Sequence, residues 1–198
     1  MVQLKLTSAS FSNFQHTVKN AGCIIIGDEI LNSKIVDTNS RFFAKKCYEN
    51  GINLRKITVV GDNEEDIIDT VHQFVSKYDF TVTTGGIGST HDDLSYQSIA
   101  KAFKIPLEFN QQTYDRAMKL NPECVPAKSN KELWDSLTRM IRLPYAAGRT
   151  RILYSPASWT PVVTIDSKLA ILPGVPKFFE DLLANGLFPY LNVPGNPF

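Results

Sequence analysis

One stretch decides the fold of this chain: Phe80-Thr81-Val82-Thr83-Thr84-Gly85-Gly86-Ile87-Gly88-Ser89-Thr90-His91-Asp92-Asp93-Leu94-Ser95. Its first five residues include four β-branched side chains in a row and predict a strand. Three glycines follow within four residues and predict a tight turn, because glycine tolerates positive φ angles. A helical pattern comes next, with four side chains spaced to lie on one face: Tyr96, Ile99, Ala100 and Phe103. The stretch therefore predicts a strand, a glycine-rich loop and a helix.

Such a loop is a candidate anion site. Glycines let the backbone approach a ligand, and a helix N-terminus adds free N–H groups and a partial positive charge. Phosphate is the anion that such sites usually bind. We therefore expect the phosphates of a substrate to lie against Thr84, Gly85, Gly86, Gly88, Ser89 and Thr90. A side chain added at Gly86 is expected to fill the space that phosphate oxygens need.

Two adjacent carboxylates, Asp92 and Asp93, end the loop. Acids beside a phosphate site are unfavourable unless a cation lies between them, and divalent cations take oxygen ligands from carboxylates and phosphates together. We expect both to act as metal ligands and catalytic residues. The alternative is that they only complement the helix dipole, since Thr90 and Asp93 have the spacing of a capping box. His91 is a candidate general base or an ordinary loop residue.

Strands and helices alternate along most of the chain. The apolar residues 21–27 suit a strand buried on both faces, and Asp28 and Glu29 follow it directly. Residues 54–60 predict a second strand, with Asn63 as the N-cap of the next helix. Ligands gather at the carboxyl ends of such strands, so we expect Asp28 to assist Asp92 and Asp93. This alternation predicts an α/β fold with a mostly parallel sheet.

The second half of the chain contains a hairpin and another glycine turn. Residues 162–165 and 169–172 predict two strands around an Asp166-Ser167 turn. Pro173 and Gly174 then form a second place where backbone amides can meet an anion. Residues 133–141 predict a helix, whereas residues 104–128 predict a loop region with one short helix at most.

The amino-acid composition argues against several classes of function. The 198 residues carry a formal net charge of +1, and 43% are hydrophobic, so we expect no nucleic-acid or membrane partner. The three cysteines are scattered and predict buried thiols in a reducing compartment rather than zinc ligands or disulfides. We expect residues 1–20 to be a poorly ordered tail and residues 21–198 to be one domain. The location expected is cytoplasmic, with mitochondria as the alternative.

Several of these elements resemble one family. The run from Thr84 to Ser95 is similar to the signature of the molybdopterin-binding-like (MoCF) superfamily, in the branch of the CinA N-terminal domain and the N-terminal domain of animal FAD synthase. Gly27-Asp28-Glu29-Ile30-Leu31, Asp37-Thr38-Asn39 and Leu172-Pro173-Gly174-Val175-Pro176 also match its elements. The chain departs from the pattern at Ser89, where a proline is common, at residues 156–161, and at Lys177 and Phe178, where an acidic residue is common.

The resemblance implies a three-layer α/β domain that binds a phosphorylated, ring-bearing small molecule. It adds Asn39, Pro173 and Gly174 to the substrate-binding residues. It implies a nucleotide pyrophosphatase that uses a divalent metal, cobalt or magnesium, and potassium, and that cleaves FAD or ADP-ribose. The alternatives are a molybdopterin or flavin-nucleotide binding module without turnover, and a molybdopterin adenylyltransferase. The resemblance also implies a homo-oligomer, either a dimer or a trimer.

Overall fold

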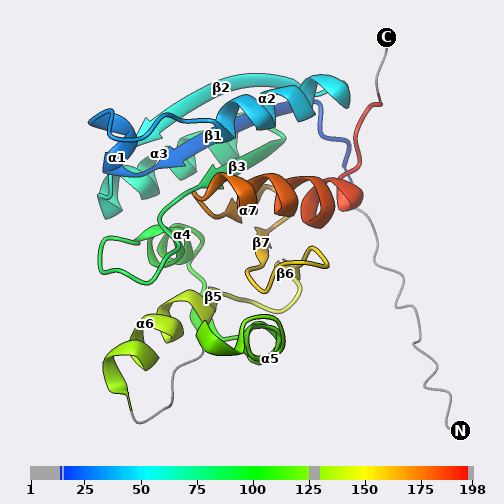
Figure 1. Cartoon of the computed structure of the whole chain (residues 1–198). Coiled ribbons are helices and arrows are strands. Elements are labelled where there is room, and N and C mark those ends of the chain that lie inside the picture. Colours follow the sequence, from blue (N-terminus) through cyan, green and yellow to red (C-terminus); the bar gives the residue numbers. More distant parts are fainter. Residues whose placement is uncertain (1–13, 15, 125–129, 196–198) are drawn as a thin grey trace, which may run out of the picture.

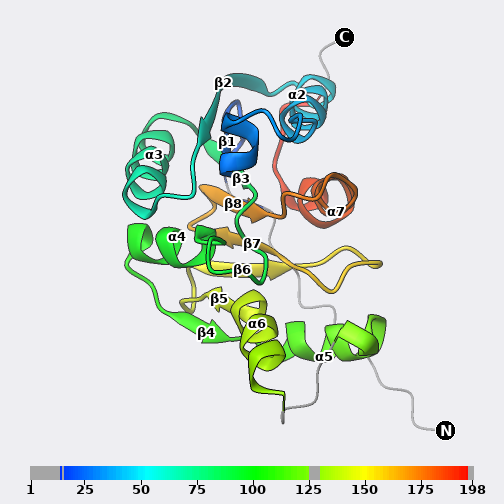
Figure 2. The same ribbon diagram turned by 60° about the vertical axis from the view of Figure 1, so that its left-hand side comes forward.

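A six-stranded sheet forms the centre of the molecule (Figures 1 and 2). The structure is a computed structural model that describes residue 14, residues 16–124 and residues 130–195. The strand order is β2-β1-β3-β8-β7-β6. The strands are β1 (Asn20–Ile26), β2 (Asn53–Val60), β3 (Phe80–Thr84), β6 (Thr150–Leu153), β7 (Val162–Ile165) and β8 (Leu169–Leu172). The first four strands in this order are parallel, and β7 runs antiparallel to both of its neighbours.

Helices cover both faces of the sheet, which makes the three layers that the family resemblance implies (Figure 2). Helices α2 (Asn39–Glu49) and α7 (Pro176–Asp181) lie on one face, and α7 continues into a π-helical segment, Leu182–Leu187. Helices α3 (Glu64–Lys77) and α4 (Ser95–Phe103) lie on the other. Each face has its own hydrophobic core. The predicted α/β class and mostly parallel sheet are therefore confirmed.

Strands β1, β3 and β8 occupy the middle of the sheet, and this explains their composition. All five residues of β3 and all four of β8 are buried, as are the last six residues of β1. A strand covered on both faces needs a continuous run of apolar or small side chains rather than alternation. The predicted hairpin is also present, since Asp166 and Ser167 between β7 and β8 both have positive φ angles, 52° and 55°.

A smaller unit extends beyond the β6 edge (Figure 2). It contains β4 (Leu107–Phe109) paired with β5 (Arg142–Pro144), and helices α5 (Gln111–Leu120) and α6 (Lys131–Ile141). The predicted loop region over residues 104–128 contains the helix α5, which the prediction of one short helix allowed, and also the strand β4, which it did not include. Helix α5 is mostly polar and buries only Thr113 and Ala117, so few apolar residues mark it in the sequence. The predicted helix over residues 133–141 is confirmed as α6.

The described end of the expected tail belongs to the core. Phe14 and Val18 are buried, and the Phe14 ring packs edge-on against Phe80 at 5.6 Å between centroids. Cys23 and Cys47 are buried free thiols, as predicted, and burial raises the pKa of Cys47 to about 12. Within the described residues, no helix is long and apolar enough to cross a bilayer.

Candidate functional site

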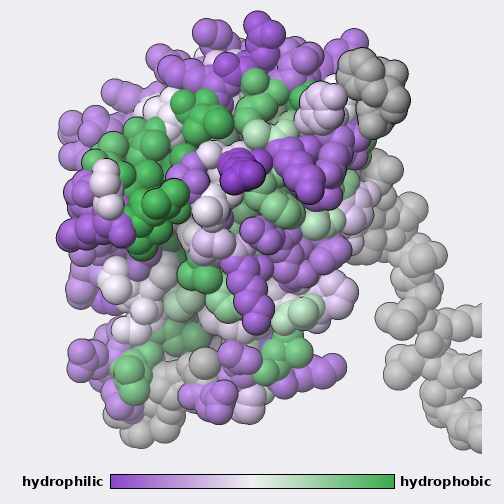
Figure 3. Space-filling view, turned by 45° about the horizontal axis from the view of Figure 1, so that its top comes forward, coloured by the Kyte–Doolittle hydropathy of each residue, from purple (hydrophilic) through white to green (hydrophobic). Residues whose placement is uncertain are grey.

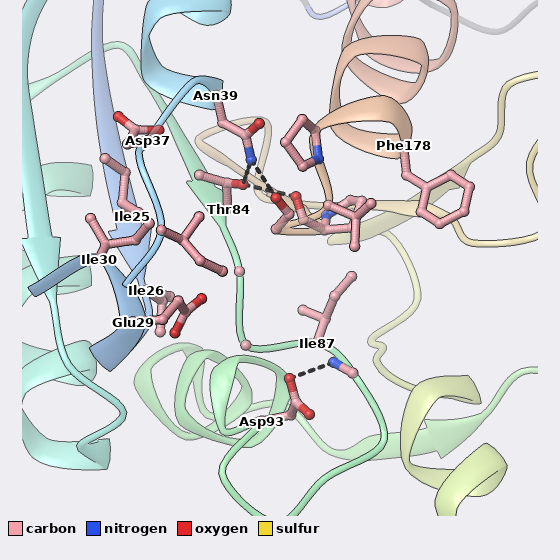
Figure 4. A pocket seen from close by; sticks show the side chains of 18 of the residues that line it. Ile25, Ile26, Glu29, Ile30, Asp37, Asn39, Thr84, Ile87, Asp93 and Phe178 are labelled. Carbon is pink, nitrogen blue, oxygen red and sulfur yellow. Dashed lines mark hydrogen bonds between the residues drawn. The ribbon is translucent and has the colours of Figure 1, made fainter. Parts of the chain in front are cut away.

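The candidate site lies where β1, β3 and β8 end (Figure 4). The chain leaves β1 toward β2 on one side and later returns to place β3 on the other side. Loops that diverge in this way leave a crevice at the carboxyl ends of the strands. Two adjoining pockets occupy it, and both are lined by Ile26, Glu29, Gly86 and Asp93.

The first pocket has a volume of about 430 Å³ and is mainly apolar. It contains seven of the substrate-binding residues predicted from the sequence, which come from segments far apart in the chain: Asn39, Thr84, Gly85, Gly86, Gly88, Pro173 and Gly174. Its apolar wall comes from residues that include Ile25, Ile30, Ile35, Val36, Ile87, Met140, Trp159, Val175 and Phe178. Residues 156–161 and Phe178, where the sequence departs from the family pattern, thus contribute to this pocket through Trp159, Thr160 and Phe178.

The second pocket is polar, with a volume of about 470 Å³. It brings together the three predicted catalytic acids, Asp28, Asp92 and Asp93, with Glu29 and Asp62. Thr90 and Lys34 also line it. Ser89 lines neither pocket, so the structure separates it from the other predicted phosphate ligands.

Asn39, the first residue of α2, joins the ends of β3 and β8 through two hydrogen bonds of its side chain. Its side-chain nitrogen donates to the Thr84 hydroxyl at 2.9 Å and to the Gly174 carbonyl at 2.8 Å (Figure 4). Thr84 in turn donates to the Pro173 carbonyl at 2.8 Å. Because a carbonyl can only accept, these contacts fix the orientation of the Asn39 amide. One buried side chain therefore holds the loops after β3 and β8 in register.

The glycines of the loop allow it to pack closely against its neighbours. Gly85 and Gly86 have φ angles of 103° and 64°, as expected for this turn. A Cβ on Gly85 would lie 2.1 Å from the Ile26 carbonyl oxygen. A Cβ on Gly86 would lie 2.4 Å from the Ser95 hydroxyl. The expectation that a side chain at Gly86 would first fill phosphate space is therefore corrected: it would first collide with the start of α4.

Asp93 braces the same loop. One carboxylate oxygen accepts from the Gly88 amide at 2.7 Å, and the other accepts from the Thr90 amide and hydroxyl at 2.8 and 2.6 Å. The predicted capping box is absent, because α4 begins at Ser95 and Thr90 donates its hydroxyl instead of accepting. Asp93 thus has a structural role within the loop, whereas Asp92 is exposed in the polar pocket.

Helix α6 holds the outer part of the loop. Arg139 donates to the Ser89 carbonyl at 2.8 Å, and its guanidinium lies 3.2 Å from the ring nitrogen Nε2 of His91. Both loop residues therefore contact the smaller unit. The next residue of α6, Met140, lines the apolar pocket. The smaller unit is thus part of the site and sets the position of the loop.

Asp62 is a site residue that the sequence reasoning missed. It follows β2, and its carboxylate accepts a hydrogen bond from the Asp28 amide at 3.1 Å, while the Asp62 amide donates to the Asp28 carboxylate at 3.3 Å. Burial raises the pKa of Asp62, and the nearby charges of Asp28, Glu29 and Asp93 add to this. The same rule that selected Asp28, an acid at the carboxyl end of a parallel strand, would have selected it.

The carboxylates do not form a closed metal site. Among the described residues, no group of three or more His, Cys, Asp or Glu side chains is arranged to hold a metal ion. A resident metal ion held by protein ligands alone does not fit this arrangement. The acids do concentrate negative charge in one pocket, and magnesium-type cations commonly use one or two carboxylates together with substrate phosphates.

Known proteins share this architecture. The CinA protein of Thermoplasma acidophilum aligns with a TM-score of 0.70 and 28% identity, covering 84% of this chain and 95% of that structure. The molybdopterin biosynthesis Mog protein of Mycobacterium ulcerans aligns with a TM-score of 0.54 at 15% identity, over 84% of this chain and 90% of the other, which shows the common fold alone.

Similar sequences lead to the same family. A "Probable FAD synthase" of Caenorhabditis elegans is 35% identical over 86% of this chain and 36% of its own length. A CinA-like protein of Myxococcus xanthus is 30% identical over 84% of this chain and 38% of its own length. The chain thus spans just over a third of these relatives. The model of the family described as "Probable molybdopterin binding domain" matches residues 22–193, and the chain therefore belongs to this family.

Proposed function

We propose that this domain binds a phosphorylated small molecule with an aromatic ring and hydrolyses its diphosphate, with FAD as the leading substrate and ADP-ribose as the next. One observation carries the proposal: an apolar pocket and an acidic pocket meet at Gly86 and Asp93. A ring fits the apolar side, and a diphosphate accompanied by a cation fits the acidic side. The two ends of a nucleotide diphosphate have this chemistry.

The glycine loop supplies donors at the junction. No hydrogen bond within the described residues engages the backbone amides of Gly86 and Ile87. Amides that point toward a crevice bind phosphate oxygens in many proteins. Lys34, which lines the acidic pocket, adds a positive charge. The phosphates would therefore lie against Gly86 and Ile87, next to the pocket with the acids.

The acids would serve a cation that enters with the substrate. A divalent ion such as cobalt or magnesium would offset the phosphate charge and bind between the phosphates and Asp92, with Asp28 nearby. Asp93 keeps the loop in shape and lies beside that position. Potassium is proposed as a further ion on the family resemblance alone. The names of the relatives support the substrate, because the matching region is part of proteins named FAD synthase.

A binding module without turnover is the second candidate function. The absence of a closed metal site in the described residues and the engagement of Asp93 within the loop both favour it. A molybdopterin adenylyltransferase is a third, supported only by fold relatives such as the Mog protein. These candidates differ in their products. A binding module releases no product, a pyrophosphatase releases mononucleotides, and an adenylyltransferase forms an adenylylated pterin.

A direct assay tests the proposal. The pure protein is incubated with FAD, ADP-ribose or NAD, with or without cobalt or magnesium, and in potassium or sodium buffer. We expect FMN and AMP from FAD only when the divalent ion is present. Binding of FAD by calorimetry without any released mononucleotide would replace hydrolysis with the binding module. Failure of all three compounds to bind would reject both.

A further inference from the structure

Two aromatic side chains, Trp159 and Phe178, line the apolar pocket together. Trp159 lies half-buried in the loop after β6, and Phe178 lies in the first turn of α7, at the pocket's edge in Figure 4. The function proposed above does not assign a role to either. Neither belongs to the glycine loop, since Trp159 comes from the segment between β6 and β7 and Phe178 from α7.

Several large apolar side chains are exposed at the mouth of this pocket. Among the described residues eleven large apolar side chains are exposed, and four of them line this one pocket: Ile35, Val36, Val175 and Phe178. Val36 is 81% exposed and Phe178 is 48% exposed. Figure 3 shows a hydrophobic patch at the left, on the side where Figure 1 places α1 (Asp28–Leu31), which precedes Ile35 and Val36. Exposed apolar patches beside a pocket mark ligand-binding grooves.

The loop that carries Trp159 is held rigidly. Arg116 from α5 donates to the Ser155 carbonyl at 2.8 Å and to the Ser158 carbonyl at 2.7 and 3.2 Å. Its guanidinium lies over the Tyr154 ring, 4.5 Å from the centroid. The Ser155 hydroxyl also donates to Asp181. A wall fixed in this way loses little conformational entropy when a ligand binds, so it is preorganised for contact with that ligand.

We infer that Trp159 and Phe178 form an aromatic wall that selects ligands by stacking on a flat aromatic ring carried on a phosphate ester, a flavin or purine nucleotide. The inference rests on the proposed site but not on its catalysis. Stacking on aromatic side chains contributes affinity for any flat ring. Arg116 is the positioning residue of the wall, since it contacts the loop and not the pocket. Ring-free phosphate esters should bind without using the wall.

The experiment compares three ligands on the whole chain: FMN, AMP and ribose 5-phosphate. Binding is followed by calorimetry, and for FMN also by quenching of flavin fluorescence. We expect Trp159→Leu and Phe178→Leu each to weaken FMN or AMP by about tenfold or more, and to leave ribose 5-phosphate unchanged. Trp159→Phe should restore most of the affinity. The tighter of FMN and AMP in the wild type identifies the ring that the wall takes.

Trp134→Leu is the matched control, because Trp134 lies in α6, contacts Tyr114 and lines neither pocket. Unchanged FMN and AMP binding in both wall variants would overturn the inference, as would an equal loss for ribose 5-phosphate. If Trp159→Leu does not fold, Phe178→Leu decides, since about half of the Phe178 side chain is exposed and its replacement disturbs the core less. Ring-dependent binding without cleavage of any diphosphate would reject hydrolysis and keep the wall. Cleavage of a diphosphate, with unchanged FMN and AMP affinity in both wall variants, would support hydrolysis and reject the wall.

Discussion

The side-chain nitrogen of Asn39 lies 2.9 Å from the hydroxyl oxygen of Thr84, although 45 residues separate the two along the chain. The same nitrogen reaches the Gly174 carbonyl at 2.8 Å. These contacts join α2 to the ends of β3 and β8, and they fix the distance between the two glycine turns. The shape of the binding crevice therefore depends on the side-chain amide of Asn39.

Asn39→Ala should lower the free energy of unfolding by about 1–3 kcal/mol, because it removes two hydrogen bonds, and one of them is the buried bond to the Thr84 hydroxyl. Ligand affinity should fall as well, since the two turns lose their common support. Denaturant unfolding and FAD calorimetry measure the two effects. Asn185→Ala, at an exposed position in the π-helical segment after α7, is the control. Equal stabilities of Asn39→Ala and the wild type would contradict the role of Asn39.

Asp92 and Asp93 should respond differently to substitution. Asp93→Ala removes three hydrogen bonds inside the loop and should reduce both stability and phosphate binding. Asp92→Ala removes an exposed charge and should leave the melting temperature unchanged while it abolishes cleavage. Thermal melting and the mononucleotide assay give the two readouts. Normal cleavage by Asp92→Ala would reject its place in catalysis.

Asp62 should make stability depend on pH. Burial raises its pKa in the folded state, so the folded protein holds this proton more tightly than the unfolded chain. Stability from this group therefore falls as the pH rises from about 3.9, the ordinary value for aspartate, through the raised pKa. Asp62→Asn should raise the melting temperature at pH 7, and the gain should vanish near pH 4.

The pH series needs a control for the loss of a negative charge. Asp69→Asn changes an exposed acid on α3 and should shift the melting temperature little at any pH. A divalent cation should reduce the benefit of Asp62→Asn, because it offsets the repulsion among Asp28, Glu29 and Asp62 in the wild type. A stabilisation by Asp62→Asn that is the same at pH 4 and pH 7 would contradict the electrostatic explanation.

Gly86→Ala should destabilise the fold. The left-handed backbone costs about 1–2 kcal/mol with a Cβ present, and the Cβ would also meet the Ser95 hydroxyl at 2.4 Å. Gly148→Ala is a matched control, because Gly148 has a φ angle of 78° and no atom within 4 Å of the added Cβ. Chemical unfolding should show a larger loss for Gly86. Adding Ser95→Ala should recover part of the difference, and its failure to do so would locate the cost elsewhere.

A homo-oligomer, a dimer or trimer, stays a prediction from the family resemblance. Leu133 on α6 is exposed and could supply the contact, whereas Phe42 on α2 packs partly against the core. Leu133→Glu should then shift the sedimentation mass toward that of one chain. A wild-type mass of a single chain at micromolar concentration would contradict the prediction.

The sequence was sufficient for the elements whose signals are local. The buried strands are continuous apolar or β-branched runs in the sequence. The Asn63 cap lies three residues from the Asp66 amide that it accepts from, and the Asp166-Ser167 turn directly joins the two strands of its hairpin. The glycines indicate the loop. Alternation of strands and helices then placed Asp28, Thr84 and Gly174 at one edge of the sheet. These features follow from backbone geometry and burial, which neighbouring residues largely determine.

Only the tertiary structure decided what the site residues do. Asp93 turns into its own loop instead of standing beside Asp92, Gly86 faces Ser95, and Asp62 joins the acids from another strand. Arg116 and Arg139 position the Trp159 loop and the glycine loop from helices α5 and α6, and few apolar residues mark α5 in the sequence. A hydrogen bond or a collision between groups far apart in the chain depends on where the packed layers bring them, and no local pattern encodes that distance.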